Sequence, residues 1–197
     1  DAARFVKLDV TNAESWANCV EATSAAFGAP TTLVNNAGLL HMESLLDIDP
    51  DRYEQLWKVN LKGPFLGMQA VARAMESTGG GSIINVTTLG AYAAGPGVGT
   101  YTSGKAALTN MTKTMAAEWV GMGVRVNALA PGPFLTEMMK GTAKYDDKFS
   151  DRAAEATLMK RVADPSEIVP LLRYLASDAS SYVTGEDFAI GGGMRSN

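Results

Sequence analysis

The sequence predicts an α/β fold: a doubly wound parallel sheet with helices on both faces. Short β-rich runs alternate along the chain with longer runs of helical spacing, and breaks rich in Gly and Pro separate them. Strands that alternate with helices form βαβ units, because a parallel neighbour requires a crossover connection. The 197 residues, 46% of them hydrophobic, are enough for one domain with a sizeable core. No repeat or linker divides the chain, so we expect residues 1–197 to form a single domain.

The elements can be placed by their spacing and by their start and stop signals. The expected strands are 4–10, 31–35, 82–88, 124–129 and 188–190. The expected helices are 13–27, 49–77 and 100–121, followed by one that the cap sequence Asp164-Pro-Ser-Glu167 opens. Pro64 and Pro170 should bend the helices that contain them. Residues 136–160 are charged and contain several methionines, and we expect them to form helices of a mobile flap over the substrate site.

Composition excludes several classes of function. The net charge is −4 with no basic stripe, so neither nucleic acid nor an anionic membrane is expected as the main partner. No apolar run approaches the roughly 20 residues that cross a bilayer. The one cysteine, Cys19, excludes an intramolecular disulfide and a cysteine-built zinc site, and we expect no metal. These features fit a reducing, cytoplasmic location.

The strongest local signal for chemistry is Tyr101-Thr-Ser-Gly-Lys105, at the start of an expected helix. A spacing of four residues puts both side chains on one face of the helix. A nearby ammonium favours the phenolate and lowers the tyrosine pKa from its usual value near 10. Such a tyrosine can exchange a proton with an alcohol or carbonyl oxygen. Taken alone, the spacing also fits a core tyrosine and a surface lysine.

Four further groups of residues lie at strand ends or inside a helix. The run Asn35-Asn36-Ala37-Gly38 follows a strand, where open α/β sheets bind ligands. The Thr88 hydroxyl can hydrogen-bond a substrate oxygen, and Asn60 inside a helix indicates a bend or a water site. Pro131-Gly132-Pro133-Phe134-Leu135-Thr136 forms a turn that ends in a helix cap. Each group alone also has an ordinary explanation as a turn, a strand threonine, a surface asparagine or a capped loop.

In this order and spacing, the motifs resemble the short-chain dehydrogenase/reductase family over essentially the whole chain. The resemblance implies a Rossmann-like sheet, an NAD or NADP cofactor, and Tyr101 as general acid/base with Lys105 lowering its pKa and binding the nicotinamide ribose. It implies that Asn60 positions a water near Lys105. Thr88 stands where the family usually has serine, and the resemblance implies that it orients the substrate carbonyl. The implied cofactor contacts are Asp9, Val10, Asn35, Asn36, Ala37, Gly38, Tyr101, Lys105, Pro131, Gly132, Phe134 and Thr136.

The residues that motif order places near the site are mostly apolar, so a hydrophobic alcohol or ketone is the expected substrate. The expected substrate contacts are Leu40, His41, Tyr92, Val98 and Met138. A lone histidine such as His41 is also common as an ordinary loop residue. The flap 136–160 could equally pack on a neighbouring subunit. The resemblance implies a homotetramer in which the helices 60–77 and 101–120 pair between subunits.

The glycine-rich turn that binds the cofactor pyrophosphate in this family is not found near the N-terminus. The run 4–10 resembles the family's third strand. We therefore expect that strands 1 and 2, on the order of 50 residues in units of this type, are missing from the chain, and that a working enzyme carries them before Asp1. The residue that distinguishes NAD from NADP would lie in that segment.

Three functions fit the sequence. The leading one is an NAD(P)-dependent oxidoreductase that transfers a hydride between the cofactor and a secondary alcohol or ketone. The second is a 3-oxoacyl-carrier-protein reductase, which the basic flap residues favour and the interspersed acidic ones oppose. Those basic residues are Lys140, Lys144, Lys148, Arg152, Lys160 and Arg161, and the acidic ones are Asp146, Asp147, Asp151 and Glu155. The third is a truncated, non-catalytic oligomeric scaffold, which the missing turn favours and the complete catalytic set opposes.

Overall fold

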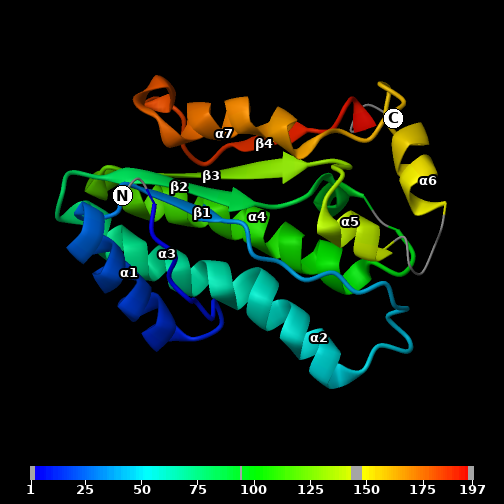
Figure 1. Cartoon of the computed structure of the whole chain (residues 1–197), viewed down its shortest axis with the longest axis horizontal. Coiled ribbons are helices and arrows are strands. Elements are labelled where there is room, and N and C mark those ends of the chain that lie inside the picture. The colour runs from blue at the N-terminus through cyan, green and yellow to red at the C-terminus, as the bar shows by residue number, and fades with distance from the viewer. Residues whose placement is uncertain (1–2, 94, 143–147, 195–197) are drawn as a thin grey trace.

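The computed structural model describes residues 3–93, 95–142 and 148–194. At its centre is a four-stranded parallel sheet in the order β1-β2-β3-β4 (Figure 1). The strands are β1 Thr32–Asn35, β2 Gly81–Val86, β3 Val124–Pro131 and β4 Asp187–Ile190. Each strand pairs in parallel with the next, and helices make the crossover connections. The predicted α/β class with a parallel sheet is confirmed.

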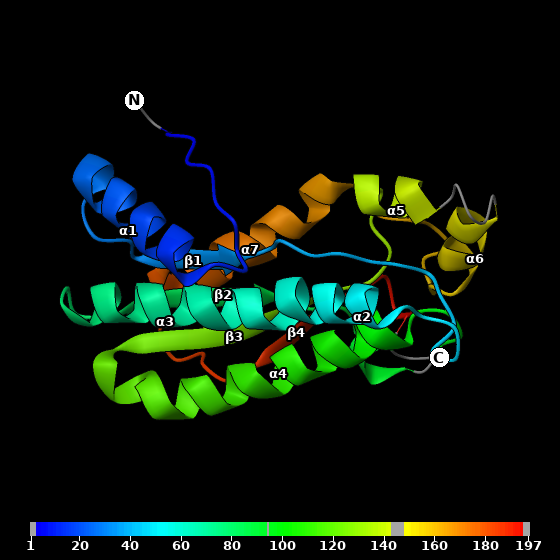
Figure 2. The same cartoon turned by 90° about the horizontal axis from the view of Figure 1, so that it is seen from below.

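Helices cover both faces of the sheet. α3 (Gly63–Glu76) and α4 (Gly99–Trp119) pack on one face, with α1 (Ala13–Phe27) outside α3, and α7 (Val169–Ala176) packs on the other face (Figures 1 and 2). Buried apolar side chains fill both layers, from Met68, Ile83 and Leu108 under α3 and α4 to Ile84, Leu129 and Leu175 under α7. The remaining helices are α2 Pro50–Trp57, α5 Glu137–Thr142 and α6 Phe149–Glu155. Short 3-10 turns lie at Leu89–Tyr92, Val120–Met122, Pro165–Ile168 and Asp178–Ser180.

Helix boundaries coincide with capping residues. The Asn12 side chain accepts from the Ser15 amide at the start of α1, and Gly28 ends that helix with a φ of 87°. Asp49 caps α2 through two backbone amides. Asp164 and Glu167 form the reciprocal capping box that their spacing predicts.

The expected helix 49–77 is broken at its middle. A π-helical turn, Lys58–Lys62, separates α2 from α3 and contains the buried Asn60. The helix is therefore irregular at Asn60, while the bend or water site that the sequence indicates there stays a prediction. Pro64 lies in the first turn of α3, where a missing N–H costs little, and Pro170 holds the same place in α7.

The predicted strand at 4–10 is wrong. These residues form no β-ladder, and Phe5 is 91% exposed. Figure 2 shows the segment running away from the sheet. A strand needs a neighbour to exchange backbone hydrogen bonds, and within the described residues β1 pairs only with β2. The pattern of side chains at 4–10 therefore cannot by itself produce a strand.

No helix within the described residues is long and apolar enough to cross a membrane.

Candidate active site at the carboxyl ends of the strands

Gly38 marks the point where four predicted site residues meet. A methyl group placed on its Cα would lie 3.2 Å from Oδ1 of Asn60, 3.6 Å from Nζ of Lys105 and 3.9 Å from Cε of Met138. Gly38 lies in the loop after β1, and the three side chains come from the π-helical turn, α4 and α5. The convergence explains why the loop has glycine here, since a larger side chain would crowd both polar groups.

Asn60 fixes the loop that follows Gly38. Its Oδ1 accepts from the Leu39 amide at 2.9 Å, and its Nδ2 donates to the Leu39 carbonyl at 2.8 Å. Both ends of the carboxamide therefore hold one residue of the loop. The water-positioning role that the resemblance gives to Asn60 stays a prediction.

Lys105 is buried, with 3% of its surface exposed. Its Nζ donates to the Val86 carbonyl, the last residue of β2, at 2.8 Å. Burial disfavours the charged ammonium and lowers the pKa of Lys105 to about 8. The lysine therefore faces the carboxyl end of the sheet with its one charged group largely out of water.

Tyr101 and Thr88 form the second half of the site. Strand β2 ends at Val86, two residues before the predicted limit, so Thr88 lies in the loop, where its Oγ1 also accepts from the Gly90 amide at 3.2 Å. Burial raises the pKa of Tyr101, and a hydrogen bond from the Thr88 side chain partly opposes the rise. The predicted lowering of this pKa by Lys105 is not found, because burial dominates and Lys105 hydrogen-bonds Val86.

The turn after β3 brings two backbones into close contact. The Gly132 amide donates to the Ile190 carbonyl at 2.9 Å, and a methyl group on Gly132 would lie 2.7 Å from Cα of Gly191. Phe134 is buried. The Thr136 hydroxyl accepts from the Met139 amide at 3.3 Å, so this residue caps α5 as predicted.

Comparison with known proteins places this arrangement in a family. The family model described as "Enoyl-(Acyl carrier protein) reductase" matches residues 1–195. The chain belongs to the short-chain dehydrogenase/reductase family.

Its relatives in this family include several dehydrogenases. A 3-alpha-(or 20-beta)-hydroxysteroid dehydrogenase of Mycobacterium tuberculosis is 39% identical over 98% of this chain and 71% of its own length. A galactitol 2-dehydrogenase (L-tagatose-forming) of Cereibacter sphaeroides is 39% identical over 98% of this chain and 75% of its own length. The crystal structure of a gluconate 5-dehydrogenase from Burkholderia cenocepacia, in complex with NADP and tartrate, superimposes with a TM-score of 0.91. That structure is 35% identical and covers 96% of this chain and 74% of its own.

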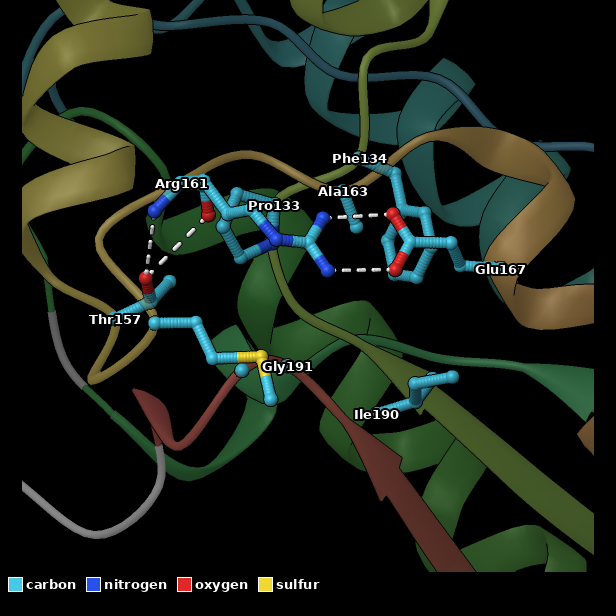
Figure 3. A pocket seen from close by; sticks show the side chains of 10 residues that line it. Pro133, Phe134, Thr157, Arg161, Ala163, Glu167, Ile190 and Gly191 are labelled. Carbon is cyan, nitrogen blue, oxygen red and sulfur yellow. Dashed lines mark hydrogen bonds and ion pairs between the residues drawn. The ribbon is translucent and has the colours of Figure 1, made fainter.

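This short-chain dehydrogenase/reductase has a pocket beside the Pro133–Phe134 turn (Figure 3). The cavity measures about 190 Å³ and is lined mainly by apolar groups of the turn, of β4 and of residues 157–163. At its edge Arg161 and Glu167 form a two-pronged ion pair, with both N–O distances 2.7 Å (Figure 3). That pairing lowers the pKa of Glu167 to about 2. Of the predicted cofactor residues, only Phe134 lines this pocket.

A buried polar chain beneath the site was missed by sequence reasoning. Asn35 donates from Nδ2 to Oδ1 of Asn85 at 2.8 Å, and Asn85 donates from Nδ2 to Oγ1 of Thr112 at 2.9 Å. Asn85 and Thr112 are fully buried. The Asn35 side chain is therefore held by a residue of the neighbouring strand β2. The signal that could have revealed Asn85 is a polar residue inside an otherwise apolar strand.

The remaining predicted residues are exposed or half-buried. Asp9 is exposed and accepts from the Thr11 amide and hydroxyl at 2.9 and 2.8 Å, while Val10 contacts Gly63. Asn36, Ala37 and Tyr92 are exposed, whereas Leu40, His41 and Val98 are half-buried. Within the flap, residues 143–147 lie outside the described residues. They include Lys144, Asp146 and Asp147, which the carrier-protein hypothesis uses.

Proposed function

We propose that the protein is an NAD(P)-dependent oxidoreductase that transfers a hydride between the cofactor and a secondary alcohol or ketone. The observation that carries the proposal is the arrangement of Thr88, Tyr101 and the buried Lys105 at the carboxyl ends of the strands. Relatives in the family are named as dehydrogenases of hydroxysteroids and of galactitol, which supports an alcohol or ketone as substrate.

The residues present fit the nicotinamide side of such a cofactor. Gly38 leaves open the space beside Asn60 and Lys105, as a close approach by a ligand requires. We propose that Lys105 and Tyr101 bind the ribose hydroxyls, and that the turn at Pro131, Gly132, Phe134 and Thr136 contacts the nicotinamide. The run Asn35–Gly38 would lie along the cofactor, and Asp9 and Val10 would contact its adenine. When bound, the cofactor supplies or accepts the hydride.

Tyr101 is the proposed general acid/base. Because burial raises its pKa, the phenol is protonated near neutral pH and can donate its proton to a substrate oxygen. In the reverse direction the phenolate accepts the proton of the alcohol. We propose that Thr88 orients the substrate, because its hydroxyl hydrogen-bonds the Tyr101 side chain and so lies beside the proposed general acid/base. Asn60 holds the adjoining loop and would position a water near Lys105.

The proposed substrate is a hydrophobic alcohol or ketone. Met138, beside Gly38, supports this proposal because it brings an apolar flap residue to the site. Leu40, His41, Tyr92 and Val98 complete the proposed contacts. The added methyl of Thr88 relative to serine restricts its rotation and should narrow the substrate range.

The carrier-protein alternative has less support in the structure. Basic side chains of this region are engaged by acidic neighbours: Lys140 by Glu137, Lys160 by Glu155, and Arg161 by Glu167. We therefore retain the small-molecule substrate as the proposal. We also propose a single catalytic domain, with 136–160 as its flap and with α3 and α4 pairing between the subunits of a homotetramer.

Binding and turnover together test the proposed function. NAD and NADP are titrated separately by fluorescence, and turnover is measured with a panel of steroid, polyol and simple secondary alcohols and with their ketones. Tyr101→Phe should lower turnover on the order of 100-fold or more. Tyr182→Phe is the matched control, since Tyr182 is fully exposed. Unchanged turnover in Tyr101→Phe would remove the assigned role, and absence of cofactor binding would favour the scaffold.

A further inference from the structure

Helix α4 is attached to strand β2 by two hydrogen bonds. Nζ of Lys105 donates to the Val86 carbonyl at 2.8 Å, and Oγ1 of Thr112 accepts from Nδ2 of Asn85 at 2.9 Å. Lys105 and Thr112 are seven residues apart, close to two helical turns, so they share one face of α4. Their partners are consecutive residues of β2. Two such attachments define both the rotation of the helix and its position along its axis.

The Asn85 end of this attachment is fixed from several sides. Its Oδ1 accepts from Nδ2 of Asn35 at 2.8 Å, and its Nδ2 also reaches Sδ of Met68 at 3.2 Å. The Thr112 hydroxyl donates in turn to the Leu108 carbonyl at 2.9 Å. Neither Asn85 nor Thr112 has any exposed surface. Buried hydrogen bonds are directional and costly to leave unmade, so the helix cannot slide without losing them.

We infer that the Asn85–Thr112 hydrogen bond positions the proton-transfer residues Tyr101 and Lys105, with Asn85 and Thr112 acting as positioning residues that touch neither substrate nor cofactor. The inference rests on the proposed function. Tyr101 lies one turn before Lys105 on α4, so a shift of the helix moves both side chains together. Apolar contacts under α4 are non-directional and fix such a shift poorly. A displacement of about 1 Å can lower a rate on the order of 100-fold.

Variants of Thr112 separate the hydrogen bond from the shape of the side chain. Thr112→Val keeps the volume and removes the acceptor, whereas Thr112→Ser keeps the hydroxyl. Thr109→Val is the matched control: Thr109 is also buried on α4, and its hydroxyl donates to the Lys105 carbonyl within the helix at 3.1 Å. The control removes a helix-internal bond of the same kind and leaves Asn85 paired. Thr112→Cys, which retains a weak acceptor, provides a second variant if the valine protein does not fold.

Two measurements decide the inference. The first is the NMR titration of the Lys105 side chain in the cofactor-free protein. The Lys105 pKa should be about 8 in the wild type, in Thr112→Ser and in Thr109→Val. It should rise toward 10.5 in Thr112→Val, because a displaced helix admits water to the ammonium. The second is turnover: Thr112→Val should lower kcat on the order of 10- to 100-fold with KM for the cofactor little changed, and Thr112→Ser should restore kcat.

The titration and the turnover measurement can contradict the positioning inference and the proposed function separately. An unchanged Lys105 titration in Thr112→Val overturns the inference, whether or not the protein turns over any substrate. Equal effects of Thr109→Val and Thr112→Val would also overturn it, since loss of any buried helix hydroxyl would then suffice. If the titration shifts as expected while the wild type neither binds a nicotinamide cofactor nor turns over, the attachment of α4 stands and the proposed function fails.

Discussion

Replacing Lys105 by methionine should change how the stability of the protein depends on pH. Lys105 is 3% exposed, and burial lowers its pKa from 10.5 to about 8. Unfolding exposes the side chain and restores the ordinary value. Between about pH 8 and about pH 10.5 the unfolded chain therefore binds a proton that the folded protein does not bind. The wild type should become more stable as the pH rises through this range.

The size of this rise follows from the two pKa values. At roughly 1.4 kcal/mol per pKa unit, the fall from 10.5 to about 8 corresponds to about 3 kcal/mol. Below about pH 8 the folded wild type carries this whole cost. Methionine has no charge, but it leaves the Val86 carbonyl without its donor, which costs about 1 to 3 kcal/mol at every pH. The variant should therefore match or slightly exceed the wild type near pH 7 and be the less stable protein near pH 10.5.

Urea unfolding of both proteins, at constant ionic strength and in steps from about pH 7 to about pH 10.5, measures the difference directly. The matched control is Lys113→Met, because Lys113 is exposed on the same helix and its replacement should leave the pH dependence of the wild type in place. A constant difference in stability between the wild type and Lys105→Met over this range would refute the reasoning. The buried lysine would then bind its proton as strongly in the folded protein as in the unfolded chain.

Three further changes have defined outcomes. Gly38→Ala places a methyl 3.6 Å from Nζ of Lys105, so titration should show weaker cofactor binding and kinetics should show turnover lowered on the order of tenfold. Thr88→Ser keeps the hydroxyl and frees its rotation, so assays over a panel of ketones should show comparable rates and a wider range of substrates. The Glu167 carboxylate has a pKa of about 2 in the folded protein, below its ordinary 4.5. Its pairing with Arg161 therefore adds stability that is complete above about pH 4.5 and is lost as the pH falls through about 2. Glu167→Gln should lack this pH-dependent component when its acid unfolding is compared with that of the wild type.

Most of the sheet and helices were predictable because their signals are local. Strand β2 follows a glycine break and is apolar apart from Ser82 and Asn85, and the Asp164–Glu167 spacing predicts its own capping box. The run 4–10 shows where local signals end. Its side chains have strand character, but pairing depends on a neighbour, and alternation within one segment does not report whether that neighbour is present.

The sequence was enough to predict which residues form the candidate site, but not their pKa values. The four-residue spacing of Tyr101 and Lys105 places both on α4, but their pKa values depend on burial that only the tertiary structure defines. Asn85 and Thr112 were missed because a single buried polar residue gives no periodic signal. Their pairing joins positions 27 residues apart in the chain.

The π-helical turn Lys58–Lys62 allows one long helical segment to serve two different neighbours. An extra residue in a helix rotates everything beyond it by about 100°. Residues before the turn, in α2, pack against α4, whereas residues after it, in α3, pack against α1 and the sheet. Deleting one residue from the turn would restore a regular helix, and the packing face of either α2 or α3 would then rotate toward solvent. The π-helical turn therefore sets the rotation of α3 relative to α2, so that each helix faces its own neighbours, and Asn60 lies within this turn.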